Sequence, residues 1–501
     1  MSKSFQSFYL ASIVVILIAA TSVLGQEIEA TITIDSKKPE LIKVEGRFST
    51  EALNRNLSFL QSVAGTGDLA KRISDLQLFD AAGNVVSFKK LSDGEYLGET
   101  EFERWTYAID ITPQKNRSAA AHVSWFVNNT GILMLADLLP RLANKSKRSA
   151  KLSFKTPADH ELAIRPSSFV LSSEVRRDEG HFDVSDIEDA VFYFGSGWEG
   201  VFSIGRPNPA GVYLSCCAWN FGAPDPSDMA SDIYLSYERS FGSRSIGPPI
   251  VAIAKFPVQT GFGEWEAETR GNSVTIISSD MPFKTQSQQR LHEQLRHELF
   301  HLWIPNGVNL TGNYDWFYEG FALYQSLKLA VSLNRIRFED FLDTLSRAHT
   351  IDSAQSQRTS LIQASTNRFS GSNTQVYARG MLVAFLTDLA MLEQSKGKRS
   401  VEDLLKDLYL KHRKPTPPTD GNTSVIEMLK TRANATSIVE KYVTGTDKIE
   451  WANELAAAGI EDSDPGPLTA LRVKEKLKGG QKAMLDKLGY NNWRKLSAPS
   501  K

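Results

Sequence analysis

The sequence predicts a multidomain α+β protein in which an all-β region, a mixed region and a helical region follow one another. Three observations lead to this fold class. Apolar and polar residues alternate in short runs over residues 27–175. Short strands and Gly/Pro loops then lead into two long helices over residues 180–333, and residues 334–501 have mostly helical patterns. Residues 1–25 stand apart as a leader.

The leader begins Met-Ser-Lys and continues as an apolar run over residues 8–24. A short positive start, an apolar stretch and small residues before Gln26 are typical of a secretory signal peptide, and we expect cleavage after Gly25. An uncleaved N-terminal membrane anchor is the alternative. No other stretch reads as long and apolar enough to cross a bilayer. We therefore expect an exported protein, periplasmic or secreted.

Composition excludes some classes of partner. The net charge is −1 over 501 residues, which implies no bulk attraction to nucleic acid or to an anionic membrane. The two cysteines, Cys216 and Cys217, are adjacent, and neighbouring cysteines rarely form a relaxed disulfide. We interpret them as buried thiols, so the size of the hydrophobic core must supply the stability.

The N-terminal region alternates most clearly at residues 29–35 and 105–111, and turn pairs such as Asp93-Gly94 separate its runs. Alternation with a period of two is typical of strands that have one buried face. The pattern predicts a β-sandwich over residues 27–175, and no residue pattern there indicates chemistry.

The motif that indicates chemistry is His297-Glu298-Leu299-Phe300-His301. Two histidines four residues apart lie on one face of a helix, so their imidazoles can bind one metal ion. A glutamate directly after the first histidine can activate a water in the open position of that metal. The alternative is a surface helix with two solvated histidines.

A second helix is expected over residues 316–333, with Glu319 near its start. The first helix should end by Ile304, because Pro305 cannot continue it. Glu319 can then be the third protein ligand, although a carboxylate in a first helical turn is also favoured by the helix dipole alone. A His/His/carboxylate set with an open position favours Zn²⁺.

The histidine motif followed by Glu319-Gly320-Phe321-Ala322 resembles the gluzincin metallopeptidases, and the chain looks most like their glycyl aminopeptidase family. The resemblance implies a thermolysin-like mixed α/β zinc peptidase domain over residues 180–333, followed by an α-helical C-terminal domain. Seventeen residues separate His301 from Glu319, which is close to the spacing in the large aminopeptidase family that carries a G-x-M-E-N motif. Relatives often end in a PDZ domain, which is not expected here.

Related aminopeptidases carry a G-x-x-E element on an edge strand beside the zinc, where the glutamate binds the free amino group of the substrate. Gly263-Glu264-Trp265-Glu266 matches that spacing, and a carboxylate is a natural partner for an ammonium group. The resemblance therefore suggests Glu266 as a substrate-binding residue. Glu264 and Glu268 compete for the role, and a solvated acidic loop is the alternative.

Residues 375–389 look like the family's Y-x-K-G-x-x-x-A-x-x-L-D-L helix, with Arg379 in place of the lysine. Gluzincin aminopeptidases place a tyrosine here with its hydroxyl directed at the zinc site. Tyr377 is the corresponding residue, and a phenol donor suits the oxyanion that forms when water adds to a peptide carbonyl. The alternative is a core tyrosine whose hydroxyl reaches water.

The expected function is a zinc metallopeptidase that acts on peptides, with Glu298 as general base and Tyr377 as oxyanion donor. The resemblance suggests an aminopeptidase that releases small N-terminal residues such as Gly or Ala. An endopeptidase on the same scaffold and a non-catalytic binding protein with a structural zinc are the alternatives. The oligomeric state is not predicted.

Overall fold

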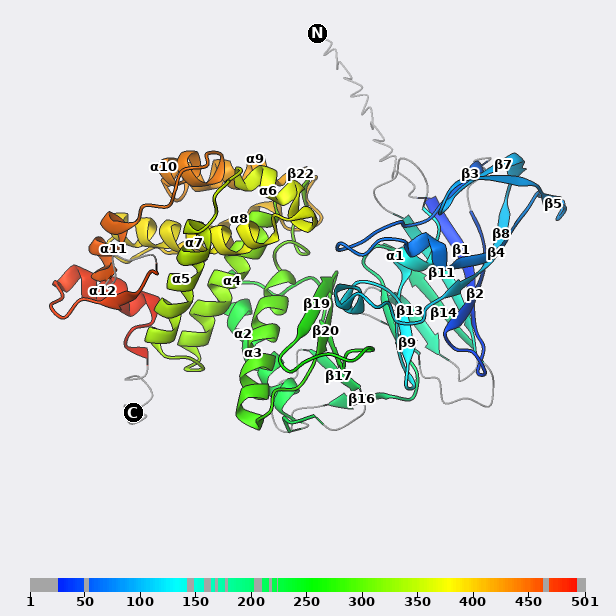
Figure 1. Cartoon of the computed structure of the whole chain (residues 1–501), viewed down its shortest axis with the longest axis horizontal. Coiled ribbons are helices and arrows are strands. Elements are labelled where there is room, and N and C mark those ends of the chain that lie inside the picture. Colours follow the sequence, from blue (N-terminus) through cyan, green and yellow to red (C-terminus); the bar gives the residue numbers. More distant parts are fainter. Residues whose placement is uncertain are drawn as a thin grey trace, which may run out of the picture.

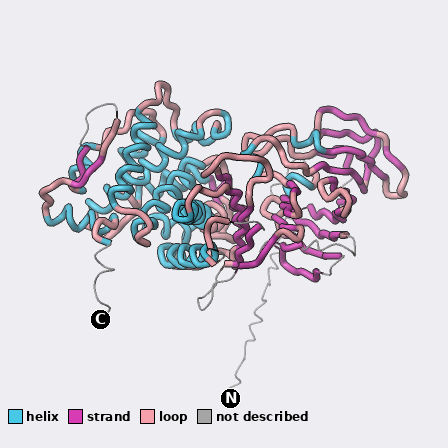
Figure 2. Tube along the Cα trace, turned by 60° about the horizontal axis from the view of Figure 1, so that its bottom comes forward, coloured by secondary structure: helices cyan, strands magenta, loops and turns pink. Residues whose placement is uncertain are grey.

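The computed structural model describes residues 26–48, 54–141, 148–156, 164–166, 170–175, 179–201, 210–215, 219–222, 224–462 and 468–492. The predicted signal peptide with its cleavage site, and both cysteines, lie outside the described residues. Figure 1 shows an elongated molecule with the N-terminal strands at one end and the C-terminal helices at the other. Figure 2 shows the same division by secondary structure, with a mixed region between the two ends.

The N-terminal end is built from strands. They are β1 (Gln26–Ile34), β2 (Leu41–Phe48), β3 (Asn54–Ser58), β4 (Ile73–Phe79), β5 (Val85–Val86), β6 (Phe88–Ser92), β7 (Glu95–Phe102), β8 (Arg104–Asp110), β9 (Trp125–Val127), β10 (Thr130–Met134), β11 (Arg148–Lys155), β12 (Ile164–Pro166), β13 (Val170–Val175), β14 (Glu179–Val184) and β15 (Val191–Phe194). The short helices η1 (Leu69–Arg72), η2 (Arg117–Ala121) and α1 (Leu135–Leu138) connect them.

These strands form an eight-stranded sheet of order β13-β14-β11-β1-β2-β8-β4-β5, a three-stranded sheet β3-β7-β6 and a four-stranded sheet β12-β15-β10-β9. All three sheets contribute to one apolar core. Pairing continues beyond residue 175, the end of the predicted β region, because β14 pairs with β11 and β15 pairs with β10.

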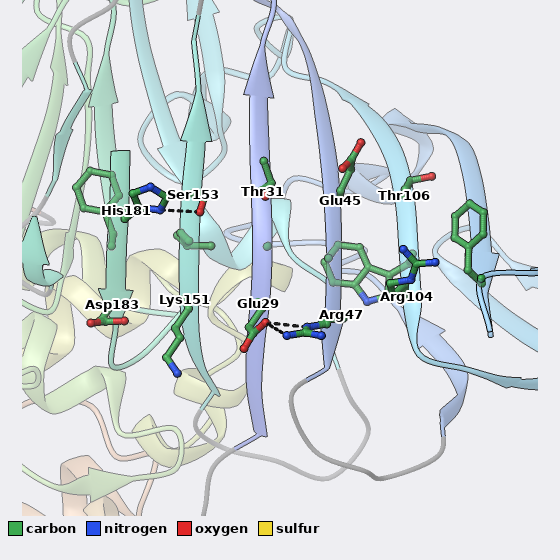
Figure 3. Close-up of a pocket in the computed structure, with 17 residues that line it drawn as sticks. Glu29, Thr31, Glu45, Arg47, Arg104, Thr106, Lys151, Ser153, His181 and Asp183 are labelled. Carbon is green, nitrogen blue, oxygen red and sulfur yellow. Dashed lines mark hydrogen bonds and ion pairs between the residues drawn. The ribbon is translucent and has the colours of Figure 1, made fainter. Parts of the chain in front are cut away.

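The eight-stranded sheet has one buried and one open face. Along β1, Ile28 and Ile32 are buried, whereas Glu29 and Thr31 point to the other side, as the alternation in the sequence predicts. The open face forms a polar cavity of about 710 Å³. Figure 3 shows its charged and hydroxyl side chains side by side on neighbouring strands, with Glu29 paired to Arg47.

The central region combines a sheet with long helices. Its elements are β16 (Trp198–Val201), β17 (Gly211–Ser215), α2 (Asp225–Phe241), β18 (Ile250–Ala254), β19 (Trp265–Arg270), β20 (Ser273–Ser278), α3 (Lys284–His301), β21 (Leu310–Thr311) and α4 (Asp315–Ser332). The sheet order is β16-β17-β18-β20-β19, so β19 is an edge strand, as the resemblance implied. The two predicted helices are confirmed as α3 and α4.

The C-terminal end is mostly helical. Its elements are α5 (Phe338–Ser353), α6 (Leu361–Thr366), η3 (Arg368–Ser370), α7 (Asn373–Gln394), α8 (Val401–His412), β22 (Thr419–Asp420), α9 (Gly421–Thr431), α10 (Thr436–Ile438), η4 (Val439–Val443), α11 (Ala452–Ala458), β23 (Ile460–Asp462), β24 (Leu471–Val473) and α12 (Gly479–Leu488). Two short strand pairs interrupt the helical pattern: β23 with β24, and β22 with β21 of the central region.

One large core joins the central and C-terminal helices, and α7 runs through it. Among the described residues, α7 is the one helix that is long and apolar enough to cross a membrane by length and composition. The expectation that no stretch after the leader meets that test was therefore wrong. Because 89% of the apolar window is buried inside the protein, α7 has the environment of a core helix.

Two glycines set the crossing of α4 and α7. A Cβ atom on Gly320 would lie 2.5 Å from Cα of Gly380, and a Cβ atom on Gly380 would lie 2.4 Å from the carbonyl oxygen of Trp316. The two backbones therefore touch at a point where no other side chain fits. This contact brings Tyr377, one turn before Gly380, beside Glu319.

Candidate active site

The three predicted metal ligands converge at the junction of α3 and α4. Nε2 of His297 lies 3.0 Å from Oε2 of Glu319 and 3.2 Å from Nε2 of His301, and Nε2 of His301 lies 3.6 Å from the same Oε2. Their ligand atoms form the one group of three or more metal-ligating side chains found among the described residues. The side chains are only 7–8% exposed.

The distances fit a tetrahedral metal ion. Ligand atoms at about 2.0–2.1 Å from zinc lie about 3.3 Å from one another in a tetrahedron. The three observed separations fall on both sides of that value. Two imidazoles and one carboxylate are also the donor set of many catalytic zinc sites. The residues present therefore fit Zn²⁺.

The end of α3 orients His301. Nδ1 of His301 lies 3.0 Å from the carbonyl oxygen of Ile304, which follows the helix because the chain turns away before Pro305. A hydrogen bond at Nδ1 places the proton there and leaves Nε2 free to face the other ligands. Burial lowers the pKa of His301, but the adjacent Glu319 carboxylate raises it more, to about 9. Glu319 is thus close enough to compensate a positive charge at this position.

Glu298 lies on the same buried end of α3, and its partner comes from the edge strand. The hydroxyl of Thr269 on β19 donates to Oε2 of Glu298 at 2.7 Å. The same hydroxyl lies 3.1 Å from the carbonyl oxygen of Glu298. One side-chain oxygen of Glu298 is therefore held against the sheet while both residues line the cavity.

Tyr377 reaches the cavity from α7. Its ring centroid lies 6.3 Å from that of His297. Burial, together with the Glu319 carboxylate, raises the pKa of Tyr377 well above its ordinary value. The phenol therefore keeps its proton and can donate a hydrogen bond.

Sequence reasoning missed Arg368, which lies on η3 between α6 and α7. Its Nη1 atom is 2.9 Å from Oε1 of Glu319 and 3.0 Å from Oδ1 of Asp315, and its Nη2 atom donates to the Tyr377 hydroxyl at 2.5 Å. Burial would raise the pKa of Glu319, but Arg368 and the two histidines hold it well below its usual range. No motif marks Arg368, because a loop arginine is normally a surface residue.

The acidic candidates on and before β19 separate into two groups. Glu264 is partly exposed, forms an ion pair with Arg117 at 2.8 Å, and does not line the cavity. Glu266 and Glu268 do line it. Burial raises the pKa of Glu266. Burial would also raise that of Glu268, but ion pairing with His122 outweighs it, and the pKa falls to about 2.

These side chains share one cavity of about 630 Å³. The N-terminal region forms part of its wall, through residues 63–64, Ser118 and His122. A small apolar cluster fixes that contact by packing N-terminal strands against β18 and β20, and the Tyr193 hydroxyl lies 3.0 Å from Oγ1 of Thr275. The cavity is thus bounded by all three regions of the chain. Sequence reasoning had assigned no role to the N-terminal region.

Comparison with known proteins supports the fold. No protein-family model and no curated protein sequence matches the chain. An aminopeptidase N family protein from Idiomarina loihiensis superposes with a TM-score of 0.72 at 17% identity, covering 87% of this chain and 80% of that chain. An M1 zinc metallopeptidase mutant from Deinococcus radiodurans, bound to a Tyr-Ser-Ala substrate, superposes with a TM-score of 0.57 at 15% identity, covering 85% and 95%.

A further structure of the M1 zinc metallopeptidase from Deinococcus radiodurans gives a TM-score of 0.54 at 14% identity, covering 85% of this chain and 94% of that chain. At these identities the likeness shows a shared fold. The mixed α+β multidomain fold class agrees with it. The glycyl aminopeptidase subtype stays a prediction.

Proposed function

We propose that the protein is a zinc-dependent metallopeptidase, with Zn²⁺ held by His297, His301 and Glu319. The observation that carries the proposal is the meeting of three buried ligand atoms, 3.0–3.6 Å apart, in a cavity that also receives Glu298 and Tyr377. A bound zinc ion would supply Lewis-acid chemistry, polarising a peptide carbonyl and making a water more acidic.

The chain's own residues then have separate tasks. Glu298 takes the proton of the attacking water as general base and returns it to the leaving amine, while the Thr269 hydroxyl holds one of its oxygens in place. Tyr377 keeps its proton and donates a hydrogen bond to the oxyanion that develops on the carbonyl. Strand β19 lies at the edge of its sheet, where an extended peptide can add alongside it.

Within this reaction class we favour an aminopeptidase that releases small N-terminal residues such as Gly or Ala. Two carboxylates, Glu266 and Glu268, line the same cavity beside the proposed zinc ligands, and an α-ammonium group is their natural partner. Glu266 is our first candidate, because burial disfavours its charge and a substrate ammonium would compensate it. Glu268 already has His122 as an ionic partner.

An endopeptidase is the second candidate, because β19 is an edge strand and could bind a peptide that continues in both directions. A non-catalytic binding protein with a structural zinc is the third. Export is also part of the proposal, and it rests on the apolar run at residues 8–24.

The first experiment compares wild-type protein with Glu298→Gln for zinc content and hydrolysis. We expect one zinc per chain in both. We expect a loss of kcat of about 10²–10⁴-fold in the variant, since general-base catalysis is commonly worth that much. Zinc with no hydrolysis of any peptide by the wild type would reject the peptidase and favour the binding protein.

The second experiment separates aminopeptidase from endopeptidase. Gly- and Ala-amide reporters with a free amine are compared with the same sequences acetylated, for wild type, Glu266→Gln and Glu268→Gln. An aminopeptidase cleaves only the free-amine series, and loss of the amine-binding carboxylate raises KM for that series alone. Glu264→Gln is the matched control, because that acid lies outside the cavity. Equal rates on acetylated peptides would identify an endopeptidase.

A further inference from the structure

Arg368 is tied to the site by all three of its guanidinium nitrogens. Nη1 reaches the carboxylates of Glu319 and Asp315, at 2.9 and 3.0 Å, and Nη2 reaches the Tyr377 hydroxyl at 2.5 Å. Nε lies 3.4 Å from Oδ1 of Asn373. The side chain is 14% exposed, and its cationic carbon lies 5.2 Å from the centre of the Tyr377 ring.

The contact with Arg368 gives the two carboxylate oxygens of Glu319 different partners. Oε1 accepts from Arg368, whereas Oε2 is the atom that lies 3.0 and 3.6 Å from the two histidine nitrogens. A carboxylate held in this way presents one oxygen to a metal ion and cannot rotate to present the other without losing an ionic hydrogen bond. Arg368 therefore favours binding of the metal through a single oxygen of Glu319.

The contact with Tyr377 fixes a proton. The phenol oxygen accepts from Nη2 of Arg368, so the hydroxyl hydrogen must point in another direction. A guanidinium at the phenol oxygen also stabilises negative charge there, which makes the O–H group a stronger donor. The same cation thus orients and strengthens the group that we propose for the oxyanion.

Two other roles for Arg368 fit the contacts less well. An arginine that binds a substrate carboxylate in a forked manner needs two free N–H groups directed at the ligand, but four of the five N–H groups of Arg368 already have acceptors within the protein. A purely structural arginine, such as Arg358, is bonded to the carbonyl oxygens of Asp352 and Ser353 and does not line the cavity. Two partners of Arg368, Glu319 and Tyr377, belong to the proposed catalytic machinery.

We propose that Arg368 is a positioning residue that couples the third metal ligand to the oxyanion donor: one guanidinium sets which oxygen of Glu319 faces the metal and where the Tyr377 hydroxyl points. This role rests on the proposed zinc peptidase function. Planarity matters, because a forked guanidinium can hold both partners at fixed angles, whereas the single ammonium group of lysine cannot.

The test compares Arg368→Gln and Arg368→Lys with Arg358→Gln, a matched arginine whose side chain is 16% exposed. The first readout is the zinc dissociation constant, measured by competition with a chelator. Residues that support metal ligands commonly contribute about 10–100-fold to affinity. We expect a loss of that size for Arg368→Gln, a smaller loss for Arg368→Lys, and no more than about threefold for Arg358→Gln.

The second readout is a kinetic cycle with Tyr377→Phe at saturating zinc. Arg368→Gln should lower kcat with little change in KM, because it acts on a group that works in the transition state. In the Tyr377→Phe background the same substitution should have much less effect on kcat, because the hydroxyl it positions is absent.

Two results would overturn the role of Arg368. One is an unchanged zinc dissociation constant in Arg368→Gln. The other is a fold loss of kcat in the double variant, Arg368→Gln with Tyr377→Phe, that equals the product of the losses in the two single variants. If Arg368→Gln does not fold, as judged by circular dichroism, Arg368→Lys decides both readouts, because it keeps the positive charge beside Asp315. Failure of the peptidase function can be told apart from failure of the Arg368 role. A wild type that binds zinc without hydrolysing peptides would reject the function and still allow the zinc affinities to be compared.

Discussion

Two large cavities among the described residues differ in how their charged groups are supported. On the open face of the eight-stranded sheet, in a cavity of about 710 Å³, the ion pair of Glu29 and Arg47 has side chains that are 35% and 50% exposed. In the candidate active site, of about 630 Å³, Glu319 and Arg368 are 7% and 14% exposed. The larger cavity is lined by one layer of strands, and the smaller one by elements from all three regions.

This difference shows why volume alone does not identify a site. Water screens charges on an exposed sheet face, so their interactions are weak. In a buried cleft the same charges interact strongly, and each one needs a partner or a ligand. The histidines, carboxylates and guanidinium of the cleft are therefore arranged with a specificity that the sheet face does not require.

Loss of one metal ligand should have the largest effect in this comparison. Residues that only support a metal ligand contribute up to about 100-fold to affinity. We expect the loss of a ligand itself, in His301→Ala, to weaken zinc binding by more than that and to reduce hydrolysis to background. Zinc content after dialysis and kcat/KM on a free-amine reporter measure the two effects. Retention of stoichiometric zinc in His301→Ala would contradict the ligand assignment. His181→Ala, on the sheet face (Figure 3), is the matched histidine control.

A smaller effect is expected from Gly380→Ala, which tests how the cleft is assembled. The added methyl group would lie 2.4 Å from the carbonyl oxygen of Trp316, so α7 must move away from α4. Overpacking of this kind typically destabilises a protein by about 1–3 kcal/mol. Because Tyr377 lies one turn before this contact, kcat should fall as well.

Thermal unfolding and kcat measured on the same sample test both consequences of Gly380→Ala. Gly371→Ala is a control at an open position near the start of the same helix, where an added Cβ meets no neighbouring atom within 4 Å, although its positive φ adds some strain. Normal kcat with lowered stability would show that Tyr377 does not depend on this crossing.

The sequence was sufficient for the parts of the site that lie within one helix. His297, Glu298 and His301 follow from a spacing of four on α3, and the helix ends where Pro305 requires. Glu319 was expected as the third ligand from its place near the start of the second helix, and Tyr377 was identified through resemblance to a family; the structure brings both to the same cavity. Zn²⁺ was expected from the His/His/carboxylate donor set, and the ligand distances fit it.

Residues that reach the site from other parts of the fold could not be predicted. Arg368 lies on a short helix with no pattern of its own, and its burial depends on how α7 crosses α4. His122 and Ser118 come from the N-terminal region and reach the cleft only because that region packs against the central sheet. Long-range packing of this kind leaves no local periodicity in a single sequence. For the same reason β14 and β15 extended the β region beyond the predicted boundary at residue 175.

The smallest effect is expected on the sheet face, from Arg47→Ala. Nη2 of Arg47 lies 2.6 Å from Oε2 of Glu29, so the geometry of the pair is good. Both side chains are nevertheless partly open to water, at 50% and 35%, and ion pairs at the surface contribute about 0–1 kcal/mol to stability. We expect a change in unfolding free energy within that range, measured by urea denaturation, with zinc affinity and kcat unchanged. A loss of hydrolysis in Arg47→Ala that is comparable with that of Arg368→Gln would mean that the two cavities are coupled. It would also mean that water does not screen the charges of the sheet face from the candidate active site.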